Sequence, residues 1–158
     1  MSVTIKLEGL SELEKNLDNL SKAAGKGALR RALKRAAEPT AKIAQGLAPV
    51  RTGRLKQSII VGAKLDGRQA KLHRRMFKDD RSSVELFIGP SYLRGDGGRH
   101  GHLQEFGTIN HGPQPFMRPA WDQDQKAMLQ RLSENLWEEV TKAIQRAERR
   151  AAKAAEEG

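Results

Sequence analysis

Cysteine is absent from this 158-residue chain, so the sequence offers no disulfide framework and no thiolate chemistry. Aromatic residues make up only 4% and hydrophobic residues 37%, which limits the core that a domain of this length can build. No apolar run is long enough for a signal peptide or a membrane span. We therefore expect a single domain over residues 1–158, made in a cytosol and without a membrane partner.

Positive charge is what the sequence has in excess. Twenty-nine lysine and arginine residues stand against nineteen acidic ones, for a net charge of +10. Such a charge attracts polyanions and acidic protein surfaces alike. One basic segment is Lys22 to Arg35, and a second lies within residues 66–82. The second contains the candidates for contact with DNA or an acidic surface: Arg68, Lys71, Arg74, Arg75, Lys78 and Arg81.

Helical periodicity dominates the first third of the chain. Ser11 stands three residues before Glu14, the spacing of a capping box, and leucines follow at positions 13, 17 and 20. Apolar spacings of three and four resume from about Lys22 to Gly46. Pro39 lies inside that run, and it removes a backbone donor and crowds the preceding turn. We expect two helical stretches, with a kink or a break near Glu38.

The period changes to two in the middle of the chain, which predicts β-strands. The first set of alternating apolar residues is Leu55, Ile59, Val61, Ala63 and Leu65, and the second is Val84, Leu86 and Ile88. Two such strands would pair antiparallel. The connection between them, residues 66–82, is too long for a tight hairpin, and we expect a basic mobile loop.

Helical spacing returns after Pro119 and continues almost to the last residue. The predicted apolar stripe is Met128, Leu132, Leu136, Val140, Ile144, Ala147 and Ala151. Beyond residue 145 only alanine supplies apolar surface, so residues 146–158 should form a projecting helical tail. The predicted fold class is α+β, with a long kinked N-terminal helix, a small antiparallel sheet and a long C-terminal helix.

A metal-dependent hydrolase is the least favoured function class. His100, His102 and His111 with Glu105 are residue types that suit zinc, but His100 and His102 cannot share a helical face, and no further cluster completes a ligand set. Asp122 and Asp124 are better explained as negative charge at the beginning of a helix. We expect no metal, no cofactor and no catalytic residue.

The few aromatic residues concentrate in "HLQEFGTINHGPQPFMRPAW", residues 102–121. Its three prolines lack backbone donors and exclude a regular strand ladder. An extended, stiff segment loses little entropy on docking, which favours Phe116 and Met117 as residues displayed to another subunit. The alternative is that Phe106, Phe116 and Trp121 close the domain's own core, and it applies more to Phe106 and Trp121 than to Phe116.

Three segments, in order, resemble one known family. "APVRTGRLKQSI" (residues 48–59), "HLQEFGT" (102–108) and "PQPFMRPAW" (113–121), behind a long N-terminal helix, are similar to the gene-product-ten-like tail components of tailed bacteriophages of the HK97 type. The resemblance marks the following residues as candidates for subunit or partner contacts: Arg51, Thr52, Gly53, Leu55, Glu105, Phe106, Gly107, Thr108, Pro115, Phe116, Met117, Arg118 and Pro119.

The resemblance implies a non-enzymatic structural protein of the virion, assembled in the host cytoplasm. Such a tail-completion or neck component would form a homo-oligomeric ring, a hexamer, that joins the tail tube to the head connector. Its partners would be the neighbouring tail terminator, tail tube or connector proteins, with DNA passing through the lumen. The alternative left open is a basic DNA-binding protein that uses residues 22–35.

Overall fold

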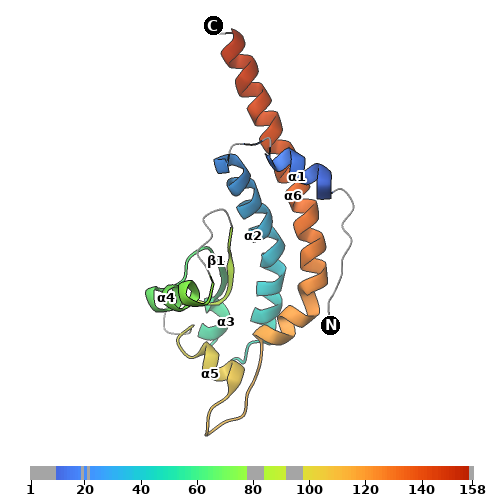
Figure 1. Cartoon of the computed structure of the whole chain (residues 1–158). Coiled ribbons are helices and arrows are strands. Elements are labelled where there is room, and N and C mark those ends of the chain that lie inside the picture. Colours follow the sequence, from blue (N-terminus) through green and yellow to red (C-terminus); the bar gives the residue numbers. More distant parts are fainter. Residues whose placement is uncertain (1–9, 19, 21, 78–83, 92–97, 157–158) are drawn as a thin grey trace.

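The computed structural model describes residues 10–18, 20, 22–77, 84–91 and 98–156 of the chain. Two long helices lie side by side and run in opposite directions (Figure 1). The short elements between residues 54 and 106 lie on one side of the pair and toward one end, whereas the first short helix lies near the other end. In chain order the elements are α1 (Leu10–Asp18), α2 (Lys22–Leu47), α3 (Arg54–Ser58), β1 (Ile59–Gly62), α4 (Gly67–Met76), β2 (Phe87–Pro90), α5 (Gly101–Phe106) and α6 (Met117–Glu156). The α+β prediction is confirmed.

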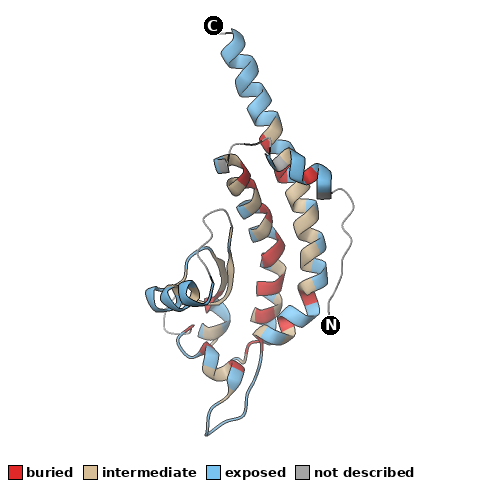
Figure 2. Cartoon of the chain, in the orientation of Figure 1, coloured by how far each residue is buried: buried red, intermediate tan, exposed pale blue. Residues whose placement is uncertain are grey.

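A repeat of four residues builds the buried face of α2. This repeat, which is buried throughout, consists of Ala28, Ala32, Ala36, Thr40, Ala44 and Ala48, the last just beyond the end of the helix. Residues four apart share one helical face, and five of these six side chains are single methyl groups, so α6 can approach closely. The buried residues accordingly form a stripe along α2 in Figure 2. Alanine buries little apolar area, so the pair needs other contacts to hold it together.

Pro39 does not end α2, because the helix continues from Lys22 to Leu47 with the proline inside. The break that the sequence allowed is therefore wrong. A proline removes one backbone donor and leaves the rest of the ladder intact. The buried residues on both sides of it, Ala36 and Thr40, hold the chain on the helical path.

The sheet consists of β1 and β2, which pair antiparallel as predicted, with Val61 opposite Ile88 and Ile59 opposite Pro90. Both strands are shorter than the alternation suggested. Residues 54–58 form the helix α3 rather than the beginning of a strand. Leu55 and Ile59 are four apart, so the same side chains fit a helical face as well as an alternating one. β2 begins only at Phe87, so Val84 and Leu86 precede it.

The connection after β1 contains a helix, which corrects the expectation of a loop over residues 66–82. α4 occupies Gly67–Met76, and the Asp66 carboxylate caps it by accepting a hydrogen bond from the Gln69 backbone N–H at 2.8 Å. Asp is a preferred N-cap residue, and Gln, Ala, Lys, Leu and Arg are good helix formers. Local propensity, the Asp66 cap and the contact of His73 with Phe87 therefore support this helix, although none of its residues is buried. Lys78 and Arg81 lie outside the described residues.

α6 is packed along its first two thirds and exposed along its last third. Of the predicted stripe, Val140 is buried, while Met128, Leu132, Leu136 and Ile144 are half-buried. Residues 145–156 are all exposed, Ala147 and Ala151 included, and the helix extends past the rest of the chain (Figures 1 and 2). None of the helices in the described ranges is both long and apolar enough to span a bilayer.

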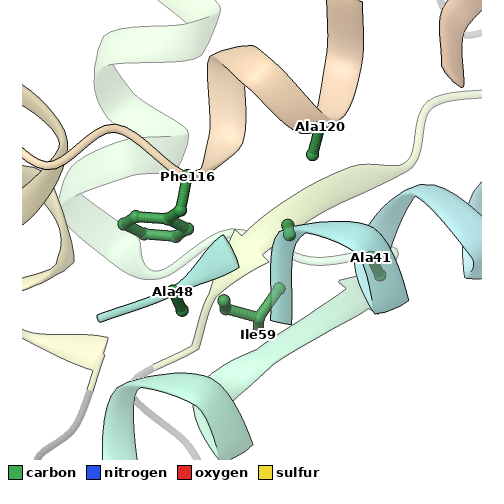
Figure 3. Packing of buried hydrophobic residues seen from close by; sticks show 6 residues of the cluster. Ala41, Ala48, Ile59, Phe116 and Ala120 are labelled. Carbon is green, nitrogen blue, oxygen red and sulfur yellow. The ribbon is translucent and has the colours of Figure 1, made fainter. Parts of the chain in front are cut away.

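One compact cluster joins the helical pair to the sheet. Figure 3 shows the Phe116 ring among Ala48, Ile59 and Ala120, and Ala41 and Ala44 complete the buried set. Partly buried side chains from five elements pack around this cluster: Ile43, Leu55, Val61, Ile88 and Met117. The ends of α2, β1 and α6 therefore meet at one point, and the segments after Ala48 and Gly101 are placed around it.

Candidate functional site

Glu105 and the beginning of α6 form the structural centre of the candidate site. The Glu105 Oε2 atom accepts hydrogen bonds from the backbone N–H groups of Phe116 at 2.8 Å and Met117 at 2.9 Å, and Oε1 accepts one from Arg118 at 3.1 Å. The first N–H groups of a helix have no partner within it, and the helix dipole favours a negative charge there. Glu105, which is 8% exposed, therefore caps a helix that begins twelve residues later in the chain.

The charge state of Glu105 follows from this geometry. Burial raises the pKa of the carboxyl, but the backbone N–H groups of Met117, Phe116 and Arg118 and the Arg118 charge outweigh burial, and the pKa lies below its usual value. Arg118 also lies over the Phe106 ring, 5.0 Å from its centroid. At neutral pH the carboxylate is thus ionised and fully engaged in structure.

The loop between α5 and α6 is held in shape by its own hydrogen bonds. Thr108 Oγ1 accepts from the N–H groups of Asn110 at 3.2 Å and His111 at 3.3 Å, and the Thr108 N–H donates to the His111 carbonyl at 2.9 Å. Gly107 has a φ of 76°, and a Cβ there would lie 2.8 Å from the Pro113 nitrogen. Only glycine fits this bend without strain. Ile109 is fully exposed at the tip.

All three family-like segments contribute residues to an open groove of about 620 Å³. Residues 49–55 form one wall, and His100, Gln104 and Gln114 form the other. Gly53 has a φ of 74°, which turns the chain into α3, and its carbonyl accepts from the Gln57 N–H at 3.0 Å. Arg51 and Thr52 are exposed on the groove wall, while Leu55 reaches back toward the core cluster.

The structure reverses the expected roles of the aromatic residues. Phe116 is 0% exposed in the core cluster of its own chain, so it is not displayed to another subunit, and that expectation is wrong. Met117 is half-buried beside it. Phe106 and Trp121, expected to be the better candidates for the core, are 63% and 48% exposed. The Glu105 cap explains the reversal, because it holds the Phe116 backbone and directs its ring into the cluster.

The remaining marked residues lie on the surface around this centre. Thr108 and Pro115 are exposed, and Pro119 is half-buried in the first turn of α6. The structure thus brings residues 51–55 and residues 105–119 together at one end of the helical pair (Figure 1). The basic candidates Arg68, Lys71, Arg74 and Arg75 lie apart from it, on α4.

Sequence reasoning missed a buried polar network between α2 and α6. Asp124, interpreted as a charge at the helix beginning, lies seven residues after Met117 and is only 5% exposed. Its carboxylate accepts from Thr40 Oγ1 at 2.5 Å and from Arg131 at 2.6 Å, and Arg131 also donates to the Ala36 carbonyl at 3.2 Å. Burial raises the pKa of Asp124, but the Arg131 and Thr40 hydrogen bonds lower it further than burial raises it. Asp124 and Arg131 lie four residues before and three residues after Met128, so both are on the apolar face of the predicted helix. Charged residues on that face were the indication in the sequence that a buried ion pair lies there.

Ion pairs with α6 engage part of the basic surface of α2. Arg31 Nε lies 2.6 Å from Glu139 Oε2, and Arg35 lies 3.1 Å from Glu138 Oε2. These two arginines belong to the segment on which the DNA-binding alternative rests. Since each faces a carboxylate of its own chain, this face offers less positive charge than the sequence suggested.

The histidines of the metal hypothesis do not converge with Glu105 on a ligand set. Both Glu105 oxygens accept hydrogen bonds from the α6 backbone, His102 is exposed, and His111 Nδ1 lies 2.9 Å from the Gly112 carbonyl. Within the described ranges, no three His, Asp or Glu side chains are close enough to share a metal ion. The chemistry here is that of helix capping and loop support.

The fold and the site together define a small α+β protein. The residues of its sequence motifs form one end of the helical pair, and a groove and a loop are exposed at that end. The family described as "Bacteriophage HK97-gp10, putative tail-component" matches residues 11–107. Because this match covers more than half of the chain, the protein belongs to the HK97-gp10-like family of bacteriophage tail components. No curated protein and no solved structure matches the chain.

Proposed function

We propose that this tail component is a non-enzymatic subunit of a ring, sixfold in symmetry, that joins the tail tube to the head connector. The proposal rests on the structure of one end of the molecule, which the family-like segments form. It presents a groove and a rigid loop, and the polar side chain at its centre, Glu105, is consumed in capping α6. Such an end is suited to contact with other subunits.

Exposed apolar side chains support contacts at this end. Val50 is 68% exposed in the groove wall, Ile109 is fully exposed at the loop tip, and Phe106 and Trp121 stand on the helices that flank the loop. Large exposed apolar side chains of this kind mark protein interaction sites when several occur together. In place of Phe116, we propose Ile109 and Val50 as contacts to neighbouring subunits or partner proteins.

The location of the protein in tails tests the proposal directly. Tails of the phage that encodes the chain are isolated, and a labelled antibody against the chain is followed by electron microscopy. We expect label at the head-proximal end and a copy number that is a multiple of six. Label along the whole tube, or none, would rule out the joining role.

Light scattering on the purified chain tests the ring by itself. A closed oligomer that Ile109→Ser and Val50→Ser shift toward monomer is the expected result, with Lys126→Ser on the exposed face of α6 as the matched control. If both apolar variants keep the wild-type mass, these side chains are not subunit contacts.

A DNA-binding protein remains the second candidate, because the net charge is +10 and α4 contains four lysine and arginine residues and no acidic one. Its test is the affinity for a short duplex across a salt series. Phosphate contacts release counterions, so affinity must fall steeply with salt. We expect only weak binding, because Arg31 and Arg35 already face carboxylates of the chain.

A further inference from the structure

The lysine and arginine side chains of one segment, residues 51–77, are left without ion-pair partners. The segment contains a single acidic residue, Asp66, whose side chain is engaged in capping α4. In the helical pair, by contrast, Arg31, Arg35 and Arg131 each pair with a carboxylate of the chain. The basic residues of the segment are all exposed, and none has a carboxylate partner in the part of the chain that the structure describes: Arg51, Arg54, Lys56, Lys64, Arg68, Lys71, Arg74 and Arg75.

α4 directs three of these cations away from the molecule. The helix is attached through His73, whose ring makes an edge contact with Phe87 at 5.3 Å between centroids. Residues three and four apart lie on one helical face, so Arg68, Lys71 and Arg75 form a row along the helix. At about 100° per residue, this row lies on the face opposite His73. We call these three side chains the basic row.

The apolar side chains of α4 lie beside the basic row and not within it. Leu72 and Met76, which are 58% and 75% exposed, continue along one side of the row. On the other side, Arg74 donates from Nε to the Ala70 carbonyl of the preceding turn at 3.3 Å. The part of α4 that points furthest from its attachment therefore offers a partner positive charge alone.

The spread of this charge fits a DNA duplex better than an acidic patch on a protein. α3 and α4 lie on the same side of the helical pair, and Arg51 and Arg54 stand in the wall of the open groove beside α3 (Figure 1). A protein surface would need a carboxylate placed for each cation. B-DNA carries a phosphate about every 3.4 Å along each strand. The basic row spans about 10 Å of helix, so it can face about three successive phosphates.

We propose that the basic row contacts the phosphate backbone of double-stranded DNA, and that α4 faces the lumen of the proposed ring. The position of the DNA in this inference rests on the proposed function, whereas the contact itself is a property of the chain. Phosphate contacts carry no sequence information, so they suit a duplex of any sequence that passes through a ring. A single copy should bind free duplex only weakly, with a Kd on the order of 10⁻⁴ to 10⁻⁶ M.

A salt series with a short labelled duplex tests the contact on the purified full-length chain. Fluorescence anisotropy gives the binding constant at each salt concentration, and each phosphate contact adds about 0.9 to the slope of log K against log salt. The triple variant Arg68→Gln, Lys71→Gln and Arg75→Gln should therefore flatten the slope by about 2 to 3. A slope equal to that of the wild type would overturn the assignment of the basic row.

A second triple variant separates the basic row from net charge. Lys126→Gln, Arg149→Gln and Arg150→Gln remove the same charge from exposed positions of α6, and the slope should change by less than about 1. Both triple variants change only exposed side chains, so both should keep the wild-type midpoint in urea, which excludes a folding defect. Equal flattening by the two variants would show that total charge, and not the row, attracts the duplex.

Two further results would assign the binding elsewhere. If Arg30→Gln with Lys34→Gln flattens the slope while the variant of the basic row does not, DNA is bound by α2 and the inference is overturned. If a polyglutamate peptide of equal charge binds the wild type more tightly than the duplex does, the row recognises an acidic protein surface instead.

Photochemical cross-linking in DNA-filled particles tests the orientation in the ring. The chain has no cysteine, so Leu72→Cys places one photoreactive label beside the basic row. We expect this label to cross-link the chain to DNA, whereas the same label at Thr141→Cys, an exposed position of α6, should not. Equal cross-linking from both positions, or none from either, would overturn the lumen-facing orientation. Antibody label away from the head-proximal end would remove the joining role and leave the salt dependence unchanged, so the two failures are distinguishable.

Discussion

The α5–α6 junction and α4 both contain large apolar side chains and charged side chains. The junction buries its phenylalanine and its carboxylate, whereas α4 exposes its apolar and its basic side chains. At the junction a phenylalanine is fully buried and a carboxylate is consumed by three backbone N–H groups. On α4 two large apolar side chains and four cations point away from the chain's own core. The junction thus contributes to the stability of one subunit, whereas α4 adds little to it and has its surface available for a partner.

Truncating Phe116 should have the largest effect on the isolated chain. Phe116→Ala removes the largest side chain of the core cluster and leaves a cavity, so we expect a loss of about 3–5 kcal/mol in the free energy of unfolding. Urea denaturation at low protein concentration measures this loss without a contribution from association. Phe116→Leu, which keeps more of the volume, is the control and should cost clearly less. An unchanged midpoint for the alanine variant would contradict the assignment of this cluster as the core.

Neutralising Glu105 should have the second largest effect. Glu105→Gln keeps the side-chain shape but removes the charge and one strong acceptor, for an expected loss of about 2 kcal/mol at neutral pH in urea denaturation. Glu148→Gln makes the same chemical change at an exposed position of α6, and as the matched control it should cost no more than about 0.5 kcal/mol. Equal losses from the two variants would show that the Glu105 charge contributes nothing through the cap.

The same carboxylate predicts a pH dependence. The pKa of Glu105 in the folded chain lies below its usual value, so its stabilisation is present above the ordinary carboxyl pKa and is lost as the pH falls through the lowered one. Asp124 has the same sign. We expect Glu105→Gln to lose part of the acid sensitivity of the wild type in unfolding experiments between neutral and acidic pH. Parallel pH profiles would show that the cap does not depend on charge.

Removing the Thr40 hydroxyl should have an intermediate effect on the helical pair. Thr40→Val keeps the shape and deletes the 2.5 Å hydrogen bond to the buried Asp124 carboxylate, for an expected loss of about 1–2 kcal/mol. Thr141→Val, at an exposed position of α6, is the matched control and should change stability by no more than about 0.5 kcal/mol. Equal effects at both positions would mean that the network adds nothing to the packing of α2 on α6.

Polar substitutions on α4 should have the smallest effect on one subunit. Leu72→Ser and Met76→Ser change exposed side chains, so we expect unfolding free energies within about 0.5 kcal/mol of the wild type. A large loss of monomer stability would show that α4 belongs to the core and would remove the contrast with the junction.

Local patterns determined much of the fold. The spacing of apolar residues placed α2 and α6, and the antiparallel pairing of β1 and β2 followed from two alternating segments. The strand limits were misplaced because Leu55 and Ile59 satisfy both periods, and α4 was missed because its apolar residues make no core contact. The family was predicted correctly, although its match ends at residue 107 and does not include the segment 113–121. The sequence did not show which of Phe116 and Phe106 is buried.

What the sequence by itself determined is therefore the kind and order of the long elements, the excess of positive charge and the family. These features depend on residues that are neighbours along the chain, so the helix and strand periods can be recognised in the sequence itself. Only the tertiary structure decided that Glu105 caps α6, that Phe116 turns inward, and that Thr40, Asp124 and Arg131 meet between two helices. Each of these contacts joins residues from different elements, and burial of a polar or aromatic side chain depends on which partners lie across from it.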